Sequence, residues 1–424
     1  MGYLKDLLKK IWAKGLLHIL AGTFMTKLVG FFGSIFLVRV LSKWEYGVLG
    51  YLENIYGYIF ILAGLGMSNA ILRYVVLGKT QEEKYSYYSY AVSRGRSYNI
   101  LLIVAALFAA WLYPHPAEYQ NWTWLLAVLA LAIPFQYITD NVLCNERAMF
   151  ANQRYAVMSL LLSFSIIVTK IISGRAGGIT GVIFCQTGLY VVLAGVYYFN
   201  SKRQYYAGCK KIPLSKERKR EINLYAFQYM ITNGLWAIFM LNDTFLLGRL
   251  GGSPEILADY KVAYTIPGSI SLISTAIGIF VAPYFVKNEK DKGWIRKNFA
   301  RTYLISAGLV GSMCLFIAIF SKPLILLLYG KQYLNISSIM MILLIAAFCN
   351  CGLRYTTANI LAAMGKVKYN MAVSVAGMVL QIAINIKMVP AYGTLAVAVT
   401  SCVVYAFMAF TLLFIFIQQY YRNR

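Results

Sequence analysis

The sequence predicts an all-α polytopic membrane protein with twelve transmembrane helices. The chain of 424 residues is 60% hydrophobic and only 13% charged, with a mean hydropathy of +0.62. A soluble domain carries about 25% charged residues, so this composition excludes an ordinary soluble fold. Apolar runs of about twenty residues recur from end to end, and each is long enough to cross a hydrocarbon core of about 30 Å as a helix.

The first fifteen residues predict a helix that lies on the membrane rather than crossing it. The apolar side chains between Leu4 and Trp12 share one helical face, and the lysines of this segment lie elsewhere. This pattern is typical of a basic amphipathic helix at the interface and does not fit a cleavable signal peptide. We therefore expect an interfacial helix over residues 1–15.

Twelve apolar runs separated by polar breaks follow this segment. They predict spans near residues 16–40, 48–75, 97–113, 122–143, 156–174, 179–200, 223–248, 258–285, 299–321, 336–357, 371–390 and 394–418. An even number of spans places both termini on the same side of the membrane.

The basic residues indicate which side that is. Of the 40 Lys and Arg residues, 27 lie in one set of loops, five lie in the alternate loops, and eight lie within or at the ends of spans. The alternate loops hold only five, which are Lys43, Arg175, Arg249, Lys322 and Lys331. Because cytoplasmic loops carry an excess of Lys and Arg, we expect both termini in the cytoplasm. The same clustering accounts for the net charge of +25 without a nucleic-acid partner.

The longest basic segment divides the chain nearly in half, and the halves resemble each other at an offset of about 215 residues. "TDNVLCNERAMFANQRYAV" (139–157) resembles "TANILAAMGKVKYNMAV" (357–373), and two shorter anchors occur in the same order. Parallel repeats of six spans are a common plan of secondary transporters. The domain prediction is therefore a lobe over 16–200, a cytoplasmic linker over 201–222, a second lobe over 223–418 and a cytoplasmic tail over 419–424.

A lysine lies near the centre of the first span. An ionisable group at mid-bilayer costs about 2.5–3.5 kcal/mol on insertion scales, so it normally faces a bundle interior or a watery cavity. Thr23, Gly30 and Ser34 share a helical face with Lys27, and the phenylalanines of this span lie on other faces. The stripe predicts a cavity-lining face.

Other spans carry further polar residues, and cations outnumber acids among them. A cavity lined this way attracts anions, and its aromatic and hydroxyl side chains suit sugars; Trp236 is one such residue. The cationic candidates for substrate binding are Lys27, Arg73, Lys170, Lys261 and Arg354. The acidic candidates, for ion coupling, are Asp140, Asp243 and Glu53.

Each candidate also has a purely structural interpretation. Arg73, Lys170, Lys261 and Arg354 lie toward span ends, from which long side chains extend to the headgroups. Small-residue stripes also pack membrane helices together without any cargo. At the repeat offset, Asp243 is level with the first-span lysine, so a structural ion pair is one alternative; proton exchange at Asp243 or Asp140 is another.

The sequence offers no catalytic, metal or cofactor motif. The two histidines, His18 and His115, are expected near opposite faces of the membrane, and the spacing of the seven cysteines is not that of a zinc site or a disulfide framework. No Walker A sequence is present, which argues against ATP hydrolysis by this chain. We expect no enzyme activity and no cofactor.

Several segments resemble one family of exporters. "TKLVGFFGSIFLVRVLSKWEYGVLGY" (26–51) and "AGLGMSNAILRYV" (63–75) resemble the opening of the Wzx-like lipid-linked oligosaccharide flippases, in the multidrug/oligosaccharidyl-lipid/polysaccharide (MOP) exporter superfamily. The features are a basic residue followed by G-F, an R-V-L-S-x-x-E-Y-G exit from span one, and G-L-G with a later Arg in span two. "LLLYGKQY" (326–333) and "NILAAMGKVKYN" (359–370) also look like this family.

The resemblance implies two six-helix lobes around a central cavity that opens alternately to each side of a bacterial inner membrane. It implies a polyprenyl-pyrophosphate-linked glycan as cargo, with O-antigen, capsule or exopolysaccharide as the end product, and membrane lipids, a polymerase and glycosyltransferases as partners. Lys27 matches the family's basic position in span one, and Arg73 the arginine that closes span two.

Three other functions remain open on the sequence. A small-molecule antiporter of the same superfamily would be expected to carry an acidic cavity when its substrates are organic cations. A peptidoglycan-precursor flippase typically adds two further spans. A non-transporting scaffold for glycan-synthesis enzymes would have no need of buried charges such as Lys27 and Asp243.

Overall fold

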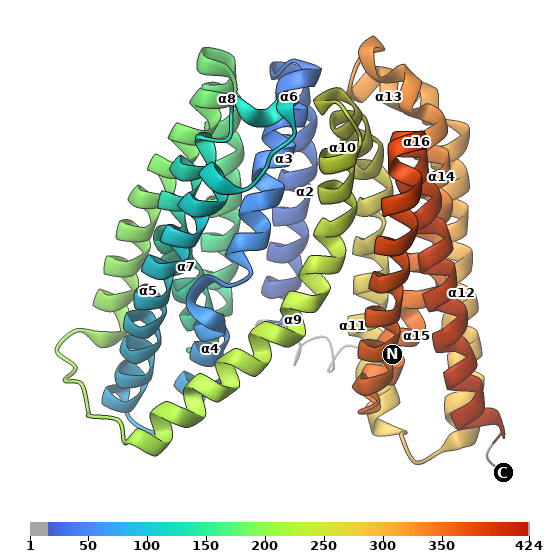
Figure 1. The fold of residues 1–424 in the computed structure, drawn as a ribbon. Coiled ribbons are helices and arrows are strands. Elements are labelled where there is room, and N and C mark those ends of the chain that lie inside the picture. Colours follow the sequence, from blue (N-terminus) through green and yellow to red (C-terminus); the bar gives the residue numbers. More distant parts are fainter. Residues whose placement is uncertain (1–15, 423–424) are drawn as a thin grey trace. The chain divides into compact units, whose positions relative to one another are not determined.

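The computed structural model describes residues 16–422, and this part of the chain is helical without any strand, as predicted (Figure 1). The interfacial helix expected over residues 1–15 lies outside the described residues, as do the last two residues of the expected tail. The elements are α2 (Leu16–Val40), α3 (Lys43–Phe60), η1 (Ala63–Gly66), α4 (Met67–Leu77), α5 (Gln81–Leu112), α6 (Ala117–Gln120), α7 (Leu125–Ala148), α8 (Asn152–Tyr206), α9 (Lys216–Leu250), α10 (Pro254–Ser269), α11 (Ser271–Lys287), α12 (Lys292–Ile319), α13 (Ser321–Leu328), η2 (Lys331–Ile336), α14 (Ser337–Ala347), η3 (Phe348–Arg354), α15 (Tyr355–Ala363), α16 (Val367–Ile417) and η4 (Gln418–Arg422).

The chain divides into two compact units, one ending at Ile238 and the other beginning at Phe239. The boundary therefore falls inside α9, so this helix contributes to both units. The lobes predicted from the sequence repeat, over 16–200 and 223–418, stay a prediction.

Within residues 16–422, nine helices are long and apolar enough to cross a membrane, or up to ten if the bent pair α3 and α4 forms one span. The protein is thus a multi-pass membrane protein. Two of the nine candidates, 152–206 and 367–421, are 55 residues long, more than twice the length of about 20 residues that a bilayer requires.

Both long helices fold back on themselves at glycines. In α8 the break is at Gly177 and Gly178, and the hydroxyl of Tyr197 donates to the carbonyl of Met158 at 2.9 Å. In a straight helix those two residues would be about 58 Å apart, at about 1.5 Å per residue. Gly178 has a φ of +56° with ψ of −145°, a conformation that essentially only glycine adopts. The two green arms of α8 therefore lie side by side (Figure 1).

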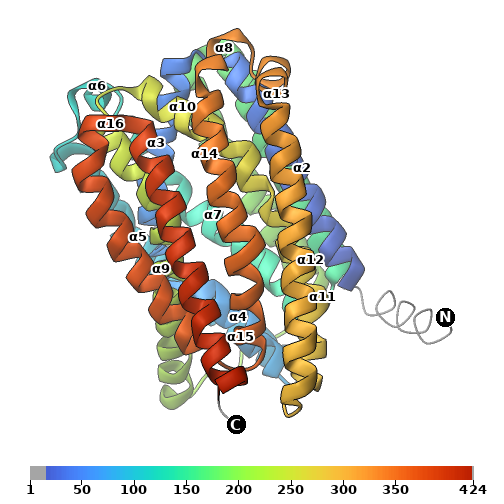
Figure 2. The same cartoon turned by 90° about the vertical axis from the view of Figure 1, so that its right-hand side faces the viewer.

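The hairpin of α16 is built in the same way. It breaks at Gly393, where φ is +51° and ψ is −126°. A Cβ atom added at Gly377 would lie 2.7 Å from the sulfur of Met408, so the two arms are closely packed (Figure 2). Both breaks coincide with gaps that the sequence predicts between neighbouring spans. The total of twelve spans stays a prediction.

Small residues hold α2 against the first arm of α8. A Cβ atom added at Gly33 would lie 2.2 Å from Ile167, and one added at Gly22 would lie 2.5 Å from Ala156. Glycine thus allows the close backbone approach that packs membrane helices. Phe32 and Phe36 of α2 are exposed, as expected for side chains that contact lipid.

A capping box explains the R-V-L-S-x-x-E-Y-G segment. The hydroxyl of Ser42 accepts from the backbone N–H of Glu45 at 3.2 Å, and the Glu45 carboxylate accepts from the backbone N–H of Ser42 at 2.9 Å. Two N–H groups that the start of α3 would leave unpaired are satisfied in this way. The motif therefore fixes where the second membrane helix begins.

The segment between α3 and α4 breaks the predicted second span. Three successive residues, Gly64, Leu65 and Gly66, have positive φ, and the two helices are bent by 45°. The side chain of Asn99 accepts from the backbone N–H of Gly64 at 2.7 Å and supports this turn. Tyr137 packs so closely on Gly64 that a Cβ atom there would lie 2.1 Å from its ring. The break opens the space in which the candidate site lies.

Candidate functional site

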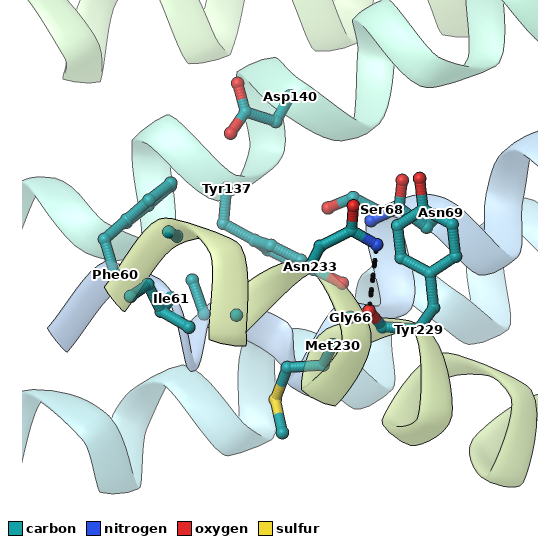
Figure 3. Close-up of a pocket in the computed structure, with 13 residues that line it drawn as sticks. Phe60, Ile61, Gly66, Ser68, Asn69, Tyr137, Asp140, Tyr229, Met230 and Asn233 are labelled. Atoms are coloured by element: carbon teal, nitrogen blue, oxygen red, sulfur yellow. Dashed lines mark hydrogen bonds between the residues drawn. The ribbon is translucent and has the colours of Figure 1, made fainter. Parts of the chain in front are cut away.

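A pocket of about 210 Å³ lies in the N-terminal unit beside this break (Figure 3). Three parts of the chain form it: the end of α3 with the start of α4, the middle of α7, and the part of α9 that belongs to this unit. The lining residues are Phe60, Ile61, Ala63, Gly66, Ser68, Asn69, Tyr137, Asp140, Tyr229, Met230, Asn233, Gly234 and Ala237.

Four of the polar side chains in this pocket hold unused hydrogen-bonding capacity. Within residues 16–422, the Asp140 carboxylate, the Asn69 amide and the Tyr229 hydroxyl make no hydrogen bond to the protein. Asn233 donates to the carbonyl of Tyr229 at 3.0 Å, as the dashed line in Figure 3 shows, and its side-chain oxygen stays available. Ser68, by contrast, already donates to Asn141 at 2.7 Å.

This set of groups suits a neutral or cationic ligand rich in hydroxyl groups. A carboxylate accepts hydrogen bonds, amides both donate and accept, and tyrosine adds a hydroxyl and an aromatic face. Because Asp140 is the one ionisable acid of the lining, the pocket does not favour an anion.

An ion pair lies elsewhere in the same unit. Nζ of Lys170 on α8 and Oε1 of Glu53 on α3 are 2.5 Å apart, and the two side chains are 13% and 27% exposed. The hydroxyl of Tyr190, also on α8, lies within electrostatic range of the carboxylates of Glu53 and Asp140. The structure therefore brings together one cationic and one acidic candidate, so the charge of Lys170 is already compensated.

The four residues of the α2 stripe share one face of a continuous helix, and its lining of a cavity stays a prediction. Thr23 and Lys27 are exposed, and Ser34 is half-buried with its hydroxyl donating to the carbonyl of Phe31 at 2.7 Å. A Cβ atom added at Gly30 would meet nothing within 4 Å. The glycines that pack on α8 lie on a different face, so this stripe borders open space.

Arg73 lies on the exposed face of α4 and stacks on an aromatic ring of α9. Its guanidinium carbon is 4.7 Å from the ring centroid of Tyr225. The neighbouring Tyr74 donates to Glu221 at 3.1 Å. These contacts fasten α4 to the start of α9, which gives Arg73 a structural role beside any role in binding.

The C-terminal unit holds a buried carboxylate, Asp243 on α9, which is only 7% exposed. Its Oδ1 accepts from the Asn385 amide at 2.8 Å, and its Oδ2 accepts from the hydroxyls of Ser401 at 2.9 Å and Tyr260 at 3.2 Å. Asn242 beside it donates to Gln381 at 3.1 Å. Three donors from three helical segments thus solvate one carboxylate inside an apolar unit.

The remaining candidates are placed separately. Arg354 is the last residue of η3, is only 5% exposed, and lies within electrostatic range of Tyr405. Lys261 is half-buried on α10, and Trp236 is 38% exposed on α9. Whether any of these side chains binds a ligand stays a prediction.

Within the described part of the chain, no group of three or more His, Cys, Asp or Glu side chains is arranged to hold a metal ion. The seven cysteines all lie in this part of the chain, and none of them forms a disulfide bond.

Sequence reasoning missed the pocket residues Asn69, Tyr229 and Asn233. The available signal was the pair Ser-Asn that follows G-L-G in an apolar run. It also missed Asn385 and Ser401, two of the three donors to the Asp243 carboxylate. The spacing of Gln381 and Asn385, four residues apart on one face of an apolar helix, was a second signal.

Comparison with known proteins settles the family. The sequence profile described as "Polysaccharide biosynthesis protein" matches residues 36–338. The chain belongs to this family. It is also 23% identical, over 357 residues, to an uncharacterized membrane protein in the cps region of Klebsiella pneumoniae, with 82% of this chain and 69% of that protein covered.

Solved structures share the fold of this polysaccharide biosynthesis protein. The lipid II flippase MurJ in an inward closed conformation matches with a TM-score of 0.73 at 15% identity, covering 94% of this chain and 87% of that one. A multidrug resistance MATE transporter of the MOP superfamily matches in its inward-facing conformation with a TM-score of 0.71 at 15% identity, covering 94% and 96%. The outward-facing conformation of such a transporter matches with a TM-score of 0.65 at 15% identity, covering 98% and 97%. The predicted resemblance to a polysaccharide family is confirmed by the family match, and the solved structures show that the chain shares its fold with these transporters.

Proposed function

We propose that the protein moves a polyprenyl-pyrophosphate-linked oligosaccharide from the cytoplasmic to the outer leaflet by alternating access. The observation that carries this proposal is the family match over residues 36–338 in a chain with a flippase-like fold. The same fold occurs in transporters solved in inward-facing and outward-facing conformations, which supports alternating access.

The two ends of such a cargo need different surroundings. A pyrophosphate carries several negative charges, and an exposed cation such as Lys27 offsets part of the cost of removing it from water. The sugars carry hydroxyl groups, which suit the available groups of Asn69, Asp140, Tyr229 and Asn233. Because Asp140 repels phosphate, we assign the pocket of Figure 3 to the glycan rather than to the pyrophosphate.

Ion coupling belongs to the same proposal. Asp243 is buried among neutral donors, so a proton taken up there changes the charge of the C-terminal unit's interior. Asp140 is the second candidate for proton exchange, because its carboxylate lines a pocket. Glu53 is a weaker candidate than either, because Lys170 already compensates its charge.

The proposed topology counts each arm of the two hairpins as one span. Ten candidate spans, with α3 and α4 taken together, and two further arms give twelve. Both termini then lie on the cytoplasmic side of a bacterial inner membrane, as the basic loops predict. Glycosyltransferases that assemble the cargo and a polymerase that uses it are the expected partner enzymes.

Reconstitution tests the proposal. Purified protein is placed in liposomes that contain the lipid-linked oligosaccharide, and a membrane-impermeant lectin or periodate measures how much glycan faces outward over time. Faster exposure than in protein-free liposomes supports the proposal. No acceleration, with correctly oriented and folded protein, contradicts it.

One observation favours a second candidate, an antiporter of small organic cations. The Asp140 carboxylate has no ion-pair partner among the described residues, and an uncompensated acid attracts a cation. Proton-driven uptake of a lipophilic cation into inverted vesicles, abolished in Asp140→Asn, would establish this alternative.

A further inference from the structure

A second cavity lies between the two arms of α8 at the end where the hairpin begins and finishes. Its volume is about 360 Å³, within the range of about 300–1,000 Å³ for ligand sites. The first arm contributes Arg154, Val157 and Met158, and the second contributes Val196 and Asn200. None of these residues belongs to the pocket of Figure 3.

The groove is a built feature of the hairpin rather than loose packing. Tyr197 of the second arm donates to the carbonyl of Met158 on the first arm, and both residues line the groove. Arg154 spans the arms at the polar end, because its Nη2 donates to Asn200 at 2.7 Å and its Nε donates to Glu146 at 3.0 Å. Glu146 is fully buried, so the position of Arg154 is fixed from below.

The walls of the groove are apolar and open to the outside of the unit. Val157 is 50% exposed and Val196 is 57% exposed. Further along the same arms, Leu161 and Val192 are exposed one helical turn away, and they extend the apolar face toward the middle of the hairpin. A chain lying in the groove would therefore contact carbon on both sides.

The polar end carries donors and positive charge. Arg154 has five N–H groups, of which the two bonds above use two. The Glu146 carboxylate compensates the charge of Arg154, so Arg154 offers N–H donors and the net positive charge comes from elsewhere. Arg203 lies three residues beyond Asn200, on the same helical face, and is exposed. The basic linker predicted over residues 201–222 overlaps the last residues of this arm. Apolar walls next to the free donors of Arg154 and the exposed charge of Arg203 form a combination that suits lipids with anionic headgroups.

We propose that this groove holds a resident anionic phospholipid of the cytoplasmic leaflet, with an acyl chain between Val157 and Val196 and its phosphate at Arg154 and Arg203. Such a lipid would act as a wedge between the arms of the hairpin. Binding of this phospholipid does not require the transported cargo, so the proposal goes beyond the transport function.

Native mass spectrometry of the full chain, delipidated and then titrated with phosphatidylglycerol or phosphatidylethanolamine, tests the proposal. We expect phosphatidylglycerol to be retained more tightly. Val157→Trp fills the groove and should weaken retention about tenfold, equivalent to the loss of roughly two buried methylene groups. Val196→Trp repeats the test from the other arm, in case the first variant fails to fold, and Val191→Trp is the control, because Val191 is exposed on the same arm but does not line the groove.

The charge at the polar end is tested separately. Arg203→Gln should weaken phosphatidylglycerol binding about fivefold, as expected for one basic residue near a headgroup. Lys202→Gln removes an equally exposed charge on another face and should have little effect.

Four outcomes would overturn the proposal. They are equal retention of the two lipids, no effect of either tryptophan in the groove, competition by glycerol phosphate as strong as by the intact lipid, and retention of polyprenyl phosphate in place of phosphatidylglycerol. Because the protein is assayed without any glycan, failure here leaves the transport proposal standing, and failure of transport leaves this site intact.

Discussion

The Glu53–Lys170 ion pair allows a direct test of which charges hold the N-terminal unit together and which contact cargo. Removing one partner takes the opposite charge of this pair away from the other inside an apolar environment. Exposed pairs are worth about 0.2–1 kcal/mol, whereas truncating one partner of a fully buried pair costs about 3–5 kcal/mol. The two side chains are 13% and 27% exposed. We therefore expect Lys170→Ala or Glu53→Ala to cost between these limits, about 1–3 kcal/mol.

Thermal unfolding in detergent measures this effect. Each single variant should unfold at a lower temperature than the parent, and the double variant should lose less than the two single losses combined, because it leaves no lone charge. The exchange Glu53→Lys with Lys170→Glu restores the pair and should recover most of the loss. Lys202→Ala, which removes an exposed charge, is the control.

Transport measured on the same variants separates the two roles of Lys170. If the exchange recovers stability and transport together, Lys170 serves the fold. If it recovers stability alone, the positive charge at Lys170 also serves the cargo. Additive losses in the double variant, or an exchange variant no more stable than the single ones, would refute the assignment of a coupled pair.

Three further predictions test other parts of the structure. Gly33→Ala places a Cβ atom 2.2 Å from Ile167 and should destabilise the protein by about 1–3 kcal/mol. Gly30→Ala is the control, because a Cβ atom there meets nothing within 4 Å and should be tolerated. Equal thermal midpoints of the two variants would count against the packing of α2 on α8. Asp243→Asn keeps the shape of the buried side chain, and the hydroxyls of Ser401 and Tyr260 can accept hydrogen bonds from the new amide instead of donating them. We therefore expect a folded protein that has lost ion coupling. Coupled transport in this variant would exclude Asp243 as the coupling group. Lys27→Ala should lose transport although the protein level stays normal, and Lys27→Arg should retain part of the transport because it keeps the positive charge. Full activity of Lys27→Ala in the liposome assay would show that Lys27 does not belong to the site.

Local patterns in the sequence predicted much of the fold. Polarity and glycine content predicted the gaps inside the two long helices, and Gly178 and Gly393 are where the chain turns back. The helix that carries the stripe through Lys27 was predicted too, because helical periodicity depends only on neighbouring residues, but its lining of a cavity stays a prediction. The break at Gly64–Gly66 was not predicted, since the apolar run continues through it unchanged.

Contacts between distant segments could not be predicted in the same way. Glu53 and Lys170 are 117 residues apart, and Asp243 and Ser401 are 158 residues apart. Periodicity shows which side of a helix is polar but not which helix covers it. The uncommitted groups of the pocket, such as Asn69, become visible only once their neighbours are known to leave them without a partner.

The central claim is that the protein moves a lipid-linked glycan. A lipid extract of cells that lack this protein, analysed by mass spectrometry for polyprenyl-pyrophosphate-linked glycans, tests the claim most directly. We predict that one such species accumulates and that restoring the protein clears it, which would also identify the cargo. Unchanged lipid-linked glycans together with normal surface polysaccharide would contradict the claim.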